Sequence, residues 1–312
     1  MLVIKSVKEV KNIVGFLNDY DIIGVGTDTR NISIEVKKEI LKYIKPAVID
    51  FKIISTPMAF FASIRKNIPV LMITGSSLSK DITGFKFIYK YYYRNFEPKP
   101  SDYYNEEKKD IMVLDIKPIY LNALKGKFQK FDYSITVDPN GGTGIYLKPL
   151  LNQLFNEVNW VNDQVNQFNH ELTVELTNLT NFNGDFYIVL DPDADQIGIY
   201  TKERFLDYKL LTYIFVEILC KRRELIVVTP DFPEKLLKVL AQRVDIIVTD
   251  NPHNVAISKK AKFYVDGYKF GFKSWYYIPD GIHTFLMLLK YLKKRNIDLQ
   301  ELIKDYDSLF HK

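Results

Sequence analysis

A stretch of apolar residues that ends in a cluster of carboxylates constrains this chain more than any other sequence feature. Residues 187–190, YIVL, are strongly apolar, and DPDADQ at 191–196 follows them with Asp191, Asp193 and Asp195 at alternate positions. A buried strand is therefore expected to end in three like charges, which repel one another unless a cation lies among them. Three oxygen ligands from one short loop suit Mg²⁺ better than a soft transition metal. An acidic turn between strands is the alternative, because Asp and Pro are common in turns.

A second loop, rich in hydroxyl groups, follows another short apolar stretch. Residues 70–73 read as a buried strand, and TGSSLS at 74–79 forms a small loop beyond its end. In open α/β sheets, loops at the ends of strands often carry chemistry. A serine in such a loop can hold a phosphoryl group, and a divalent cation would then neutralise charge as the phosphate moves to a sugar oxygen. Most hydroxyl-rich turns are only turns, so this loop needs support from elsewhere in the chain.

Strand and helix patterns alternate along the chain, which is typical of an α/β protein. A helix is expected after the first strand, within 34–41, because the apolar residues there recur at helical spacing. The charged, proline-bearing passage at 95–110 reads as a linker, and 201–208 marks a second boundary. The glycines at 141–144 predict a tight strand-to-helix turn, with a phosphate cradle as the less favoured alternative.

Short motifs along nearly the whole chain occur in the same order as in one known family. They are VGTDTR at 25–30, STP at 55–57, TGSSLS at 74–79, TGFKF at 83–87, VDPNGGTG at 137–144, DPDADQ at 191–196, DGYKFGF at 266–272 and PDGIHTFLMLLKYL at 279–292. These motifs resemble, in turn, the GRDTR, TP, TASHNP, NGIKF, VDPxNGAG, DPDADR, GGExSGH and DGI elements of the α-D-phosphohexomutases, which include phosphoglucomutases and phosphomannomutases. Collinear matches of this extent are hard to obtain by chance.

The resemblance implies an α/β fold with mixed sheets, built from three consecutive α/β/α units. We expect a first domain with the serine loop, a second with the metal-binding aspartates and a third with a degenerate sugar-binding loop, over residues 1–102, 103–203 and 204–312. The sequence contains no segment similar to the family's C-terminal fourth domain, whose loop binds the substrate's non-reacting phosphate. Either a second copy of the chain or a partner subunit is then expected to complete the cleft, or the reaction differs from that of the family.

The resemblance also assigns roles to residues that match the family's motifs. Ser76 corresponds to the phosphorylated serine, with Lys86 and Arg30 as further catalytic residues. The Mg²⁺ ligands are expected to be Asp191, Asp193 and Asp195. The implied function is intramolecular phosphotransfer between the 1 and 6 positions of glucose or mannose phosphates, through a phosphoserine and with a hexose phosphate or hexose bisphosphate as the partner molecule.

Several positions depart from the family pattern. Ser77 and Leu78 replace a His and an Asn of the serine motif, and Gln196 replaces an Arg whose positive charge it cannot supply. The loop at 268–272 lacks the carboxylate and hydroxyl that bind sugar hydroxyls, which leaves Lys269 as a weak candidate for substrate binding. The alternative function is therefore that of a non-catalytic sugar-phosphate binding or regulatory protein derived from a mutase.

The composition is that of a folded globular protein with a mild positive charge. The chain has 312 residues, 47% of them hydrophobic, and a formal net charge of +5. Basic and aromatic residues alternate at 86–96, as on a surface for single-stranded nucleic acid, but they form no recognisable binding module, so we expect no nucleic-acid partner. The single Cys220 excludes an internal disulfide, and the four histidines lack metal-ligand spacing. With no membrane-spanning stretch and no signal peptide in the sequence, we expect a cytoplasmic protein without membrane contact.

Overall fold

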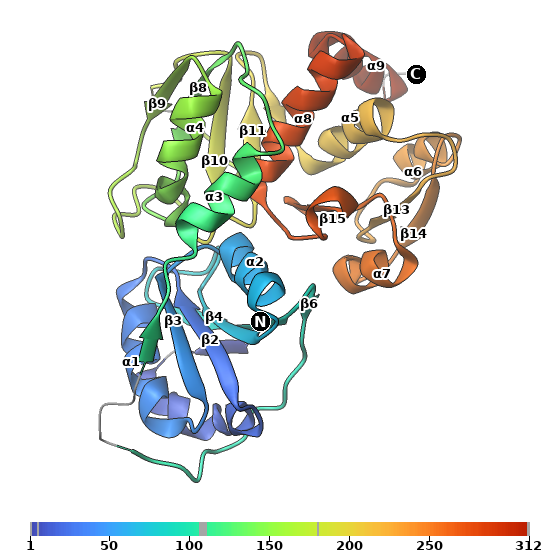
Figure 1. Ribbon diagram of the computed structural model, residues 1–312. Coiled ribbons are helices and arrows are strands. Elements are labelled where there is room, and N and C mark those ends of the chain that lie inside the picture. Colours follow the sequence, from blue (N-terminus) through green and yellow to red (C-terminus); the bar gives the residue numbers. More distant parts are fainter. Residues whose placement is uncertain (1, 5, 106–110, 180, 311–312) are drawn as a thin grey trace.

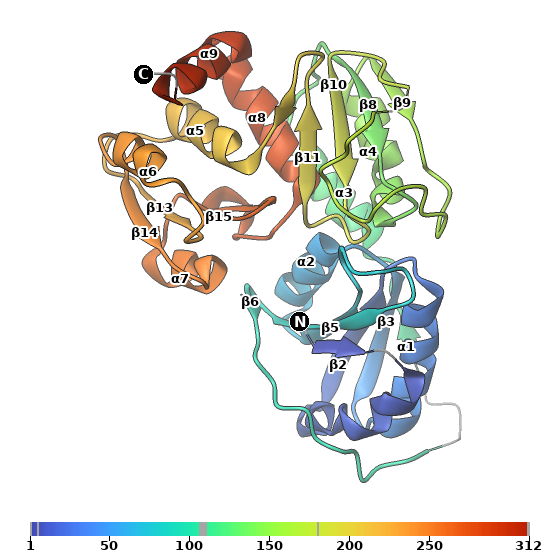
Figure 2. The same ribbon diagram turned by 180° about the vertical axis from the view of Figure 1, so that it is seen from behind.

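The computed structural model describes residues 2–4, 6–105, 111–179 and 181–310, which form three β-sheets with helices packed against them. The chain completes the sheets one after another, so this part of the protein consists of three α/β units in chain order (Figure 1, Figure 2). The predicted α/β class with three consecutive units and mixed sheets is confirmed. Within the described residues, no helix combines the length and the apolar character needed to cross a bilayer.

The first sheet places the serine loop, residues 74–79, at the end of an inner strand. Its strands run in the order β1, β5, β4, β2, β3, β7, with β6 paired to β5. Strands β2, β3, β4 and β7 are parallel, whereas β5 is antiparallel to β4 and β1. The serine loop therefore leaves the carboxyl end of β4 beside the end of β2, where open α/β sheets bind ligands. The elements are β1 (Leu2–Ile4), the 3₁₀ helices Val7–Asn12 and Gly15–Asp19, β2 (Ile22–Thr27), α1 (Asn31–Tyr43), β3 (Ala47–Ile53), α2 (Thr56–Lys66), β4 (Pro69–Ile73), β5 (Thr83–Tyr89), β6 (Tyr92–Tyr93) and β7 (Ile111–Val113).

Helix α2 lies where the three units meet (Figure 1). Ser55 caps the helix, because its Oγ accepts a hydrogen bond from Met58 N. Pro57 lies in the first turn, where a backbone N–H has no partner within the helix, so proline costs no hydrogen bond there. Most of the helix is buried on all sides, as expected for a helix between packed layers. The ring of Phe61 lies 5.7 Å from that of Tyr120 and 5.9 Å from that of Trp275, so α2 joins the first unit to both of the others.

The second sheet carries the aspartate loop, residues 191–196, between two of its strands. The strand order is β12, β11, β10, β8, β9, with β10 parallel to β8 and antiparallel to β11. The strand predicted at 187–190 is β10, and all of its residues are buried. A Cβ at Gly142 would lie 2.5 Å from Pro192 Cα, so the predicted tight turn at 141–144 packs directly against the aspartate loop. The elements are α3 (Lys117–Lys125), β8 (Ser134–Asp138), the 3₁₀ helix Thr143–Leu147, α4 (Lys148–Leu154), β9 (Glu157–Trp160), β10 (Phe186–Leu190), β11 (Ile197–Tyr200) and β12 (Phe205–Leu206).

The third sheet lies beside the second, and a long helix packs between them (Figure 1). The strand order is β14, β13, β15, β16, in which β16 alone is antiparallel to its neighbour. Helix α8 packs on β11, β16 and α5, and Gly281 at its start donates from its backbone N to Ala194 O at 3.2 Å. The elements are α5 (Tyr208–Leu219), β13 (Leu225–Val228), α6 (Glu234–Leu240), β14 (Asp245–Val248), α7 (Pro252–Lys259), β15 (Phe263–Asp266), β16 (Lys269–Phe272), the 3₁₀ helix Lys273–Trp275, α8 (Gly281–Arg295) and α9 (Leu299–Phe310).

The last strands of the first two sheets lie slightly beyond the predicted domain limits at residues 102 and 203. Strand β7 pairs with β3 in the first sheet, and β12 pairs with β11 in the second. Strand β7 follows the segment at 95–110 that was predicted to be a linker, whereas β12 lies within the predicted boundary at 201–208. The domain limits themselves stay a prediction.

Candidate active site

Three buried carboxylates face one another in the aspartate loop. Asp191, Asp193 and Asp195 are at most 1% exposed, and one carboxylate oxygen from each lies within 4.8 Å of the others. The loop is closed by Ala194 N, which donates to Asp191 O at 2.8 Å, and by Gln196 N, which donates to Asp191 Oδ1 at 2.9 Å. Ala194 has a φ of 57°, a left-handed conformation that an L-residue adopts at a cost in free energy. Such backbone strain is concentrated at functional sites.

Ser76 reaches the same carboxylates from the first unit. Its Oγ donates a hydrogen bond to Asp191 Oδ2 at 2.9 Å, and Gln196 Nε2 donates to the same Oγ at 3.4 Å. Ser76 is buried and has a φ of 47°, so it too lies in the left-handed region. The structure therefore brings the predicted phosphoserine position and the predicted metal ligands into hydrogen-bonding contact.

An ion pair beneath the serine loop fixes its backbone. Asp28 pairs with Arg30 and accepts hydrogen bonds from Thr74 Oγ1 at 2.9 Å and from Gly75 N at 3.1 Å. Arg30 Nη2 donates to the carbonyl oxygen of Ser76 at 2.6 Å. A Cβ at Gly75 would lie 2.8 Å from Arg30 Cζ, so a larger residue there would displace the guanidinium. Arg30 thus supports the loop through its backbone, and its predicted catalytic role stays a prediction.

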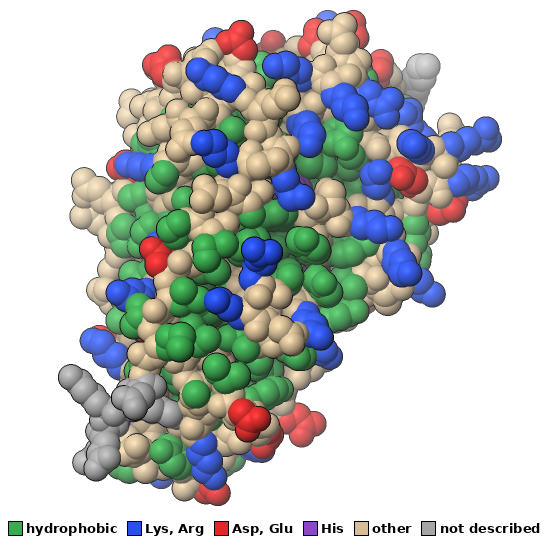
Figure 3. Space-filling view, viewed as in Figure 1, with side chains coloured by type: hydrophobic (Ala, Val, Ile, Leu, Met, Phe, Trp, Pro, Cys, Tyr) green, Lys and Arg blue, Asp and Glu red, His purple; other side chains and the backbone are tan. Residues whose placement is uncertain are grey.

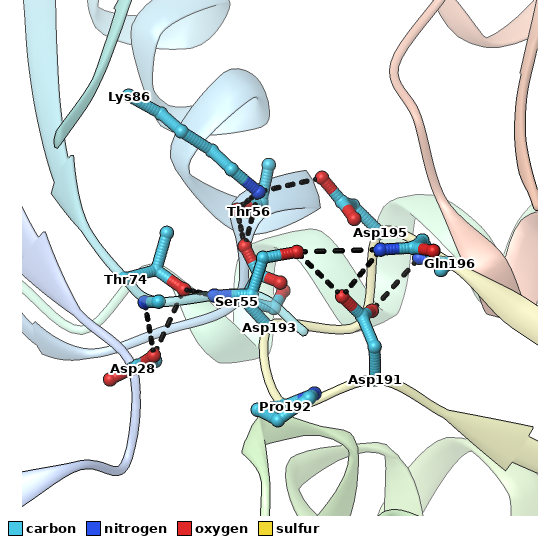
Figure 4. A network of polar contacts seen from close by, with 12 residues as sticks. Asp28, Ser55, Thr56, Thr74, Lys86, Asp191, Pro192, Asp193, Asp195 and Gln196 are labelled. Carbon is cyan, nitrogen blue, oxygen red and sulfur yellow. Dashed lines mark hydrogen bonds and ion pairs between the residues drawn. The ribbon is translucent and has the colours of Figure 1, made fainter. Parts of the chain in front are cut away.

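Lys86 bridges two of the aspartates. Its Nζ lies 2.6 Å from Asp193 Oδ2 and 2.8 Å from Asp195 Oδ2, and Figure 4 shows it pointing at both from the side of the first unit. Burial opposes the charge on Lys86, but the carboxylates of Asp193, Asp195 and Asp191 outweigh burial and hold the pKa of Lys86 well above its usual value. Lys86 is therefore an ammonium ion that compensates part of the negative charge of the loop.

The remaining carboxylate oxygens of the loop fit a magnesium ion. Asp193 Oδ1 and Asp195 Oδ1 are buried, and no donor among the described residues reaches them. Burial, reinforced by the carboxylates of Asp193 and Asp195, raises the pKa of Asp191 well above its usual value. Burial also acts to raise the pKa of Asp193, but Lys86 and Asp191 outweigh it and lower that pKa. A divalent cation among three oxygen donors would satisfy the unpaired oxygens and relieve the repulsion.

Three further residues contact the aspartates. Thr56 at the start of α2 donates from its backbone N to Asp193 O at 2.9 Å, and Tyr93 OH donates to Asp195 Oδ2 at 3.5 Å. Lys269 forms an ion pair with the same Asp195 oxygen at 3.1 Å. Thr56 belongs to the motif STP at 55–57, so a sequence signal for this residue exists. No sequence pattern pointed to Tyr93. Lys269, predicted as a substrate-binding residue, contacts the predicted metal ligand Asp195.

The loop at 268–272, predicted to be a degenerate sugar-binding loop, contributes two aromatic rings to the core. Phe270 and Phe272 are each 1% exposed, and their rings lie 5.5 and 5.1 Å from the ring of Phe215. These two side chains are packing residues. Lys269, the first residue of β16, forms an ion pair with Asp195 of the aspartate loop.

A cavity of about 480 Å³ is lined in part by Lys86, Tyr93 and Lys269, three residues that contact Asp195. Its polar lining includes Lys86, Tyr93, Arg94 and Lys269, and its apolar lining includes Phe85 and Phe96. Three of these residues are cationic, and no carboxylate of the described residues lines the cavity. Lysine and arginine side chains of this kind bind phosphate groups.

Comparison with known proteins identifies relatives of this chain. Residues 2–99 match the family model described as phosphoglucomutase/phosphomannomutase, alpha/beta/alpha domain I. The phosphomannomutase of Methanocaldococcus jannaschii is 24% identical to the chain, over a match that covers 83% of this chain and 65% of the relative. The chain thus spans somewhat less than two thirds of the length of that relative.

Two solved structures share the fold. A putative phosphomannomutase from Thermus thermophilus is similar with a TM-score of 0.80 and 18% identity, over 97% of this chain and 79% of that one. An N-acetylphosphoglucosamine mutase from Aspergillus fumigatus, solved in complex with GlcNAc-6P and magnesium, is similar with a TM-score of 0.56 and 16% identity, over 91% of this chain and 61% of that one. With the match of its first unit and this common fold, the chain is similar to phosphoglucomutases and phosphomannomutases.

Proposed function

We propose that the chain is a phosphotransferase that moves a phosphoryl group between the 1 and 6 positions of glucose or mannose phosphates through Ser76. The observation that carries this proposal is the hydrogen bond of 2.9 Å between Ser76 Oγ and Asp191 Oδ2, which joins two loops from different units. A buried, strained hydroxyl against a cluster of carboxylates is costly for stability, and such arrangements are typical of catalytic sites.

The covalent step has a simple balance of atoms. A bond forms between Ser76 Oγ and the phosphorus of a hexose bisphosphate, the bond from that phosphorus to a sugar oxygen breaks, and the serine proton ends on the sugar oxygen. The reverse step then returns the phosphoryl group to the other end of the sugar. Since phosphoryl transfer needs positioning and charge stabilisation, the fixed serine loop and the adjacent cations supply what the reaction requires.

The aspartate loop is the proposed magnesium site. Asp191, Asp193 and Asp195 would hold the ion, which when bound neutralises negative charge on the phosphoryl oxygens. Lys86 forms ion pairs with Asp193 and Asp195 and so holds both carboxylates in place within the aspartate loop. The hydrogen bonds of Asp28 and Arg30 hold the serine backbone, so Ser76 is positioned before the substrate arrives.

The cavity beside Lys86 is the proposed substrate site. A cavity of about 480 Å³ is large enough for a hexose phosphate, and Lys86, Arg94 and Lys269 offer positive charge to its phosphate. The mutase solved with GlcNAc-6P and magnesium supports a phosphorylated hexose as the ligand class. Because Phe270 and Phe272 are buried, neither side chain can contact the sugar hydroxyls, and we expect weak discrimination between glucose and mannose.

Intact-protein mass spectrometry tests the proposal. Incubation with glucose 1,6-bisphosphate and Mg²⁺ is expected to add the mass of one phosphoryl group to the wild-type chain, and no mass to Ser76→Ala. Ser77→Ala is the matched control, because Ser77 is the exposed neighbour and its loss is expected to leave the added mass unchanged. A wild-type chain that gains no phosphate would contradict the proposal.

One observation favours the non-catalytic alternative. Gln196 Nε2 donates to both Asp191 Oδ2, at 3.1 Å, and Ser76 Oγ, so an uncharged amide occupies the place where the resemblance expects a guanidinium. A binding protein would bind glucose 6-phosphate in calorimetry and yet acquire no phosphate on Ser76. A coupled assay of glucose 1-phosphate conversion then separates full turnover from phosphoserine formation alone.

A further inference from the structure

Five lysines surround a cavity at the end of α8 that lies away from the aspartate loop. The cavity has a volume of about 420 Å³, and its lysines come from the segment after α3 and from the last turns of α8. They are Lys127, Lys130, Lys290, Lys293 and Lys294. Figure 3 shows Lys and Arg side chains gathered over the part of this face where Figure 1 places α3 and α8. We call this cavity the lysine pocket.

The lysine pocket has a fixed frame. Lys290 Nζ donates to the backbone oxygen of Lys127 at 3.0 Å and lies 5.4 Å from the centre of the Phe128 ring. Lys127 Nζ in turn donates to Ser274 O at 3.1 Å. Phe131 N donates to Leu154 O at 2.7 Å, which fixes the other end of the segment. The segment after α3 is therefore tied to α8, so the two groups of lysines are held on facing walls.

The positive charge of the lysine pocket is not compensated by the described residues. None of its five lysines forms an ion pair with any of them, and no carboxylate among them lines the cavity. By contrast, Lys37, Lys148 and Lys262 elsewhere in the chain each pair with a carboxylate. Burial lowers the pKa of Lys290, and the nearby charges of Lys127 and Lys294 lower it further. Repulsion among these clustered ammonium groups destabilises the free protein. A bound anion would reduce this repulsion.

We propose that the lysine pocket binds a small soluble anion that carries two or more phosphate groups. Lysine ammonium groups bind phosphate as point charges, and five of them on two walls exceed what a single phosphate can contact. The concave shape and the volume fit a small molecule inside the pocket. The site is distinct from the candidate active site, because Lys290, Lys293 and Lys294 lie roughly 14–20 Å along the axis of α8 from Gly281, which contacts the aspartate loop.

Calorimetric titration with inorganic pyrophosphate, in low-salt buffer without divalent cations, tests this site. The test variant is Lys130→Gln/Lys293→Gln/Lys294→Gln, because these three side chains are exposed and their loss is expected to leave the fold intact. The matched control is Lys8→Gln/Lys38→Gln/Lys259→Gln, which removes the same charge from exposed positions on other elements. We expect the test variant to bind pyrophosphate about tenfold or more weakly than wild type, and the control variant within about twofold of wild type.

The comparison also tests the class of ligand. Wild-type protein is expected to bind orthophosphate at least about tenfold more weakly than pyrophosphate, because a single phosphate contacts fewer of the lysines. Equal affinity for the two anions, equal binding by test and control variants, or no pyrophosphate binding by wild type would each overturn the proposal. The titration contains neither a hexose phosphate nor Mg²⁺, so its outcome is independent of phosphorylation at Ser76.

Discussion

Two ammonium groups meet at one carboxylate oxygen in the candidate active site. Asp195 Oδ2 lies 2.8 Å from Lys86 Nζ and 3.1 Å from Lys269 Nζ. Lys86 is almost completely buried, whereas the side chain of Lys269 is 22% exposed and arrives from the third sheet. Both cations reduce the negative charge that a magnesium ion would otherwise meet at Asp195. The affinity of the aspartate loop for magnesium is therefore set partly by residues that are not ligands.

Replacing Lys269 with methionine is expected to strengthen magnesium binding. The change removes a positive charge 3.1 Å from Asp195 while it keeps much of the apolar stem, so the affinity should rise roughly three- to tenfold. Calorimetric titration with MgCl₂ measures the change. Lys262→Met is the control, since Lys262 pairs with Glu224 away from the aspartate loop. Weaker magnesium binding by Lys269→Met would instead show that Lys269 holds the loop in shape.

The start of α8 is built against the aspartate loop. A Cβ at Gly281 would lie 2.8 Å from Gln196 O and 2.8 Å from Leu190 Cδ2, which leaves no room for a methyl group. Asp280 caps the helix by accepting a hydrogen bond from His283 N at 3.0 Å. The close approach of Gly281 places the first turn of the helix in direct contact with the aspartate loop.

Gly281→Ala is expected to destabilise the protein by about 1–3 kcal/mol, because the added methyl group must displace backbone of the aspartate loop. Alanine otherwise favours a helix, so the loss cannot arise from helix propensity. Urea unfolding measures the change in free energy. Gly126→Ala is the control, since a Cβ there would meet its nearest atom, Asn122 O, at an ordinary 3.5 Å. If Gly281→Ala were as stable as wild type, the aspartate loop would be able to move aside for the methyl group without a cost in free energy.

The buried cap of α8 is expected to make stability depend on pH. Burial raises the pKa of Asp280 to about 6, although His283 N, Tyr120 OH and Trp275 Nε1 all donate to its carboxylate. The native state therefore binds a proton more tightly than the unfolded chain, whose pKa is about 3.9. The resulting contribution to the free energy of unfolding is complete below about pH 4 and is lost as the pH rises through 6.

Comparison of wild type with Asp280→Asn tests this dependence, because asparagine also caps helices but does not titrate. Between pH 4.5 and 7.5, wild type should lose on the order of 2 kcal/mol of unfolding free energy relative to the variant. Urea unfolding at several pH values gives the two curves. Parallel curves would mean that Asp280 is ionised over the whole range.

All three units hold the aspartate loop, so a ligand bound there acts on the whole molecule. Thr56 N from the first unit donates to Asp193 O at 2.9 Å, and Thr143 N from the second donates to Pro192 O at 2.8 Å. From the third unit, Tyr268 O accepts a hydrogen bond from Ile197 N at 3.2 Å, immediately after the loop. Separation of any unit would break contacts of the loop.

Magnesium is therefore expected to raise the temperature of unfolding. At a concentration a hundred times the dissociation constant, the ion would stabilise the native state by about 2.7 kcal/mol, which corresponds to a shift of roughly 4 °C for a chain of this length. Thermal unfolding with MgCl₂ and with EDTA measures the shift. Asp193→Asn should abolish it, and Asp115→Asn, which removes an exposed carboxylate outside the loop, should keep it. A shift that survives in Asp193→Asn would place the ion elsewhere.

Much of the site could be predicted because its parts are local. The strand before the aspartates, the hydroxyl loop after β4 and the tight turn at 141–144 all follow from apolar runs and turn residues within a few positions. The meeting of Ser76 with Asp191 was predicted from the resemblance and the order of the motifs. The residues themselves offered no reason to join two loops so distant in the sequence.

Short-range pattern was thus enough to establish an α/β chain with three aspartates after a buried strand, since burial and turn formation act between near neighbours. The packing of the sheets was needed to bring Tyr93 and Lys269 to Asp195, to turn Arg30 toward the carbonyl oxygen of Ser76, and to gather five lysines around one cavity. The physical reason is that such contacts result from the burial of whole helix and sheet faces, a non-directional force summed over many residues, which no single motif encodes.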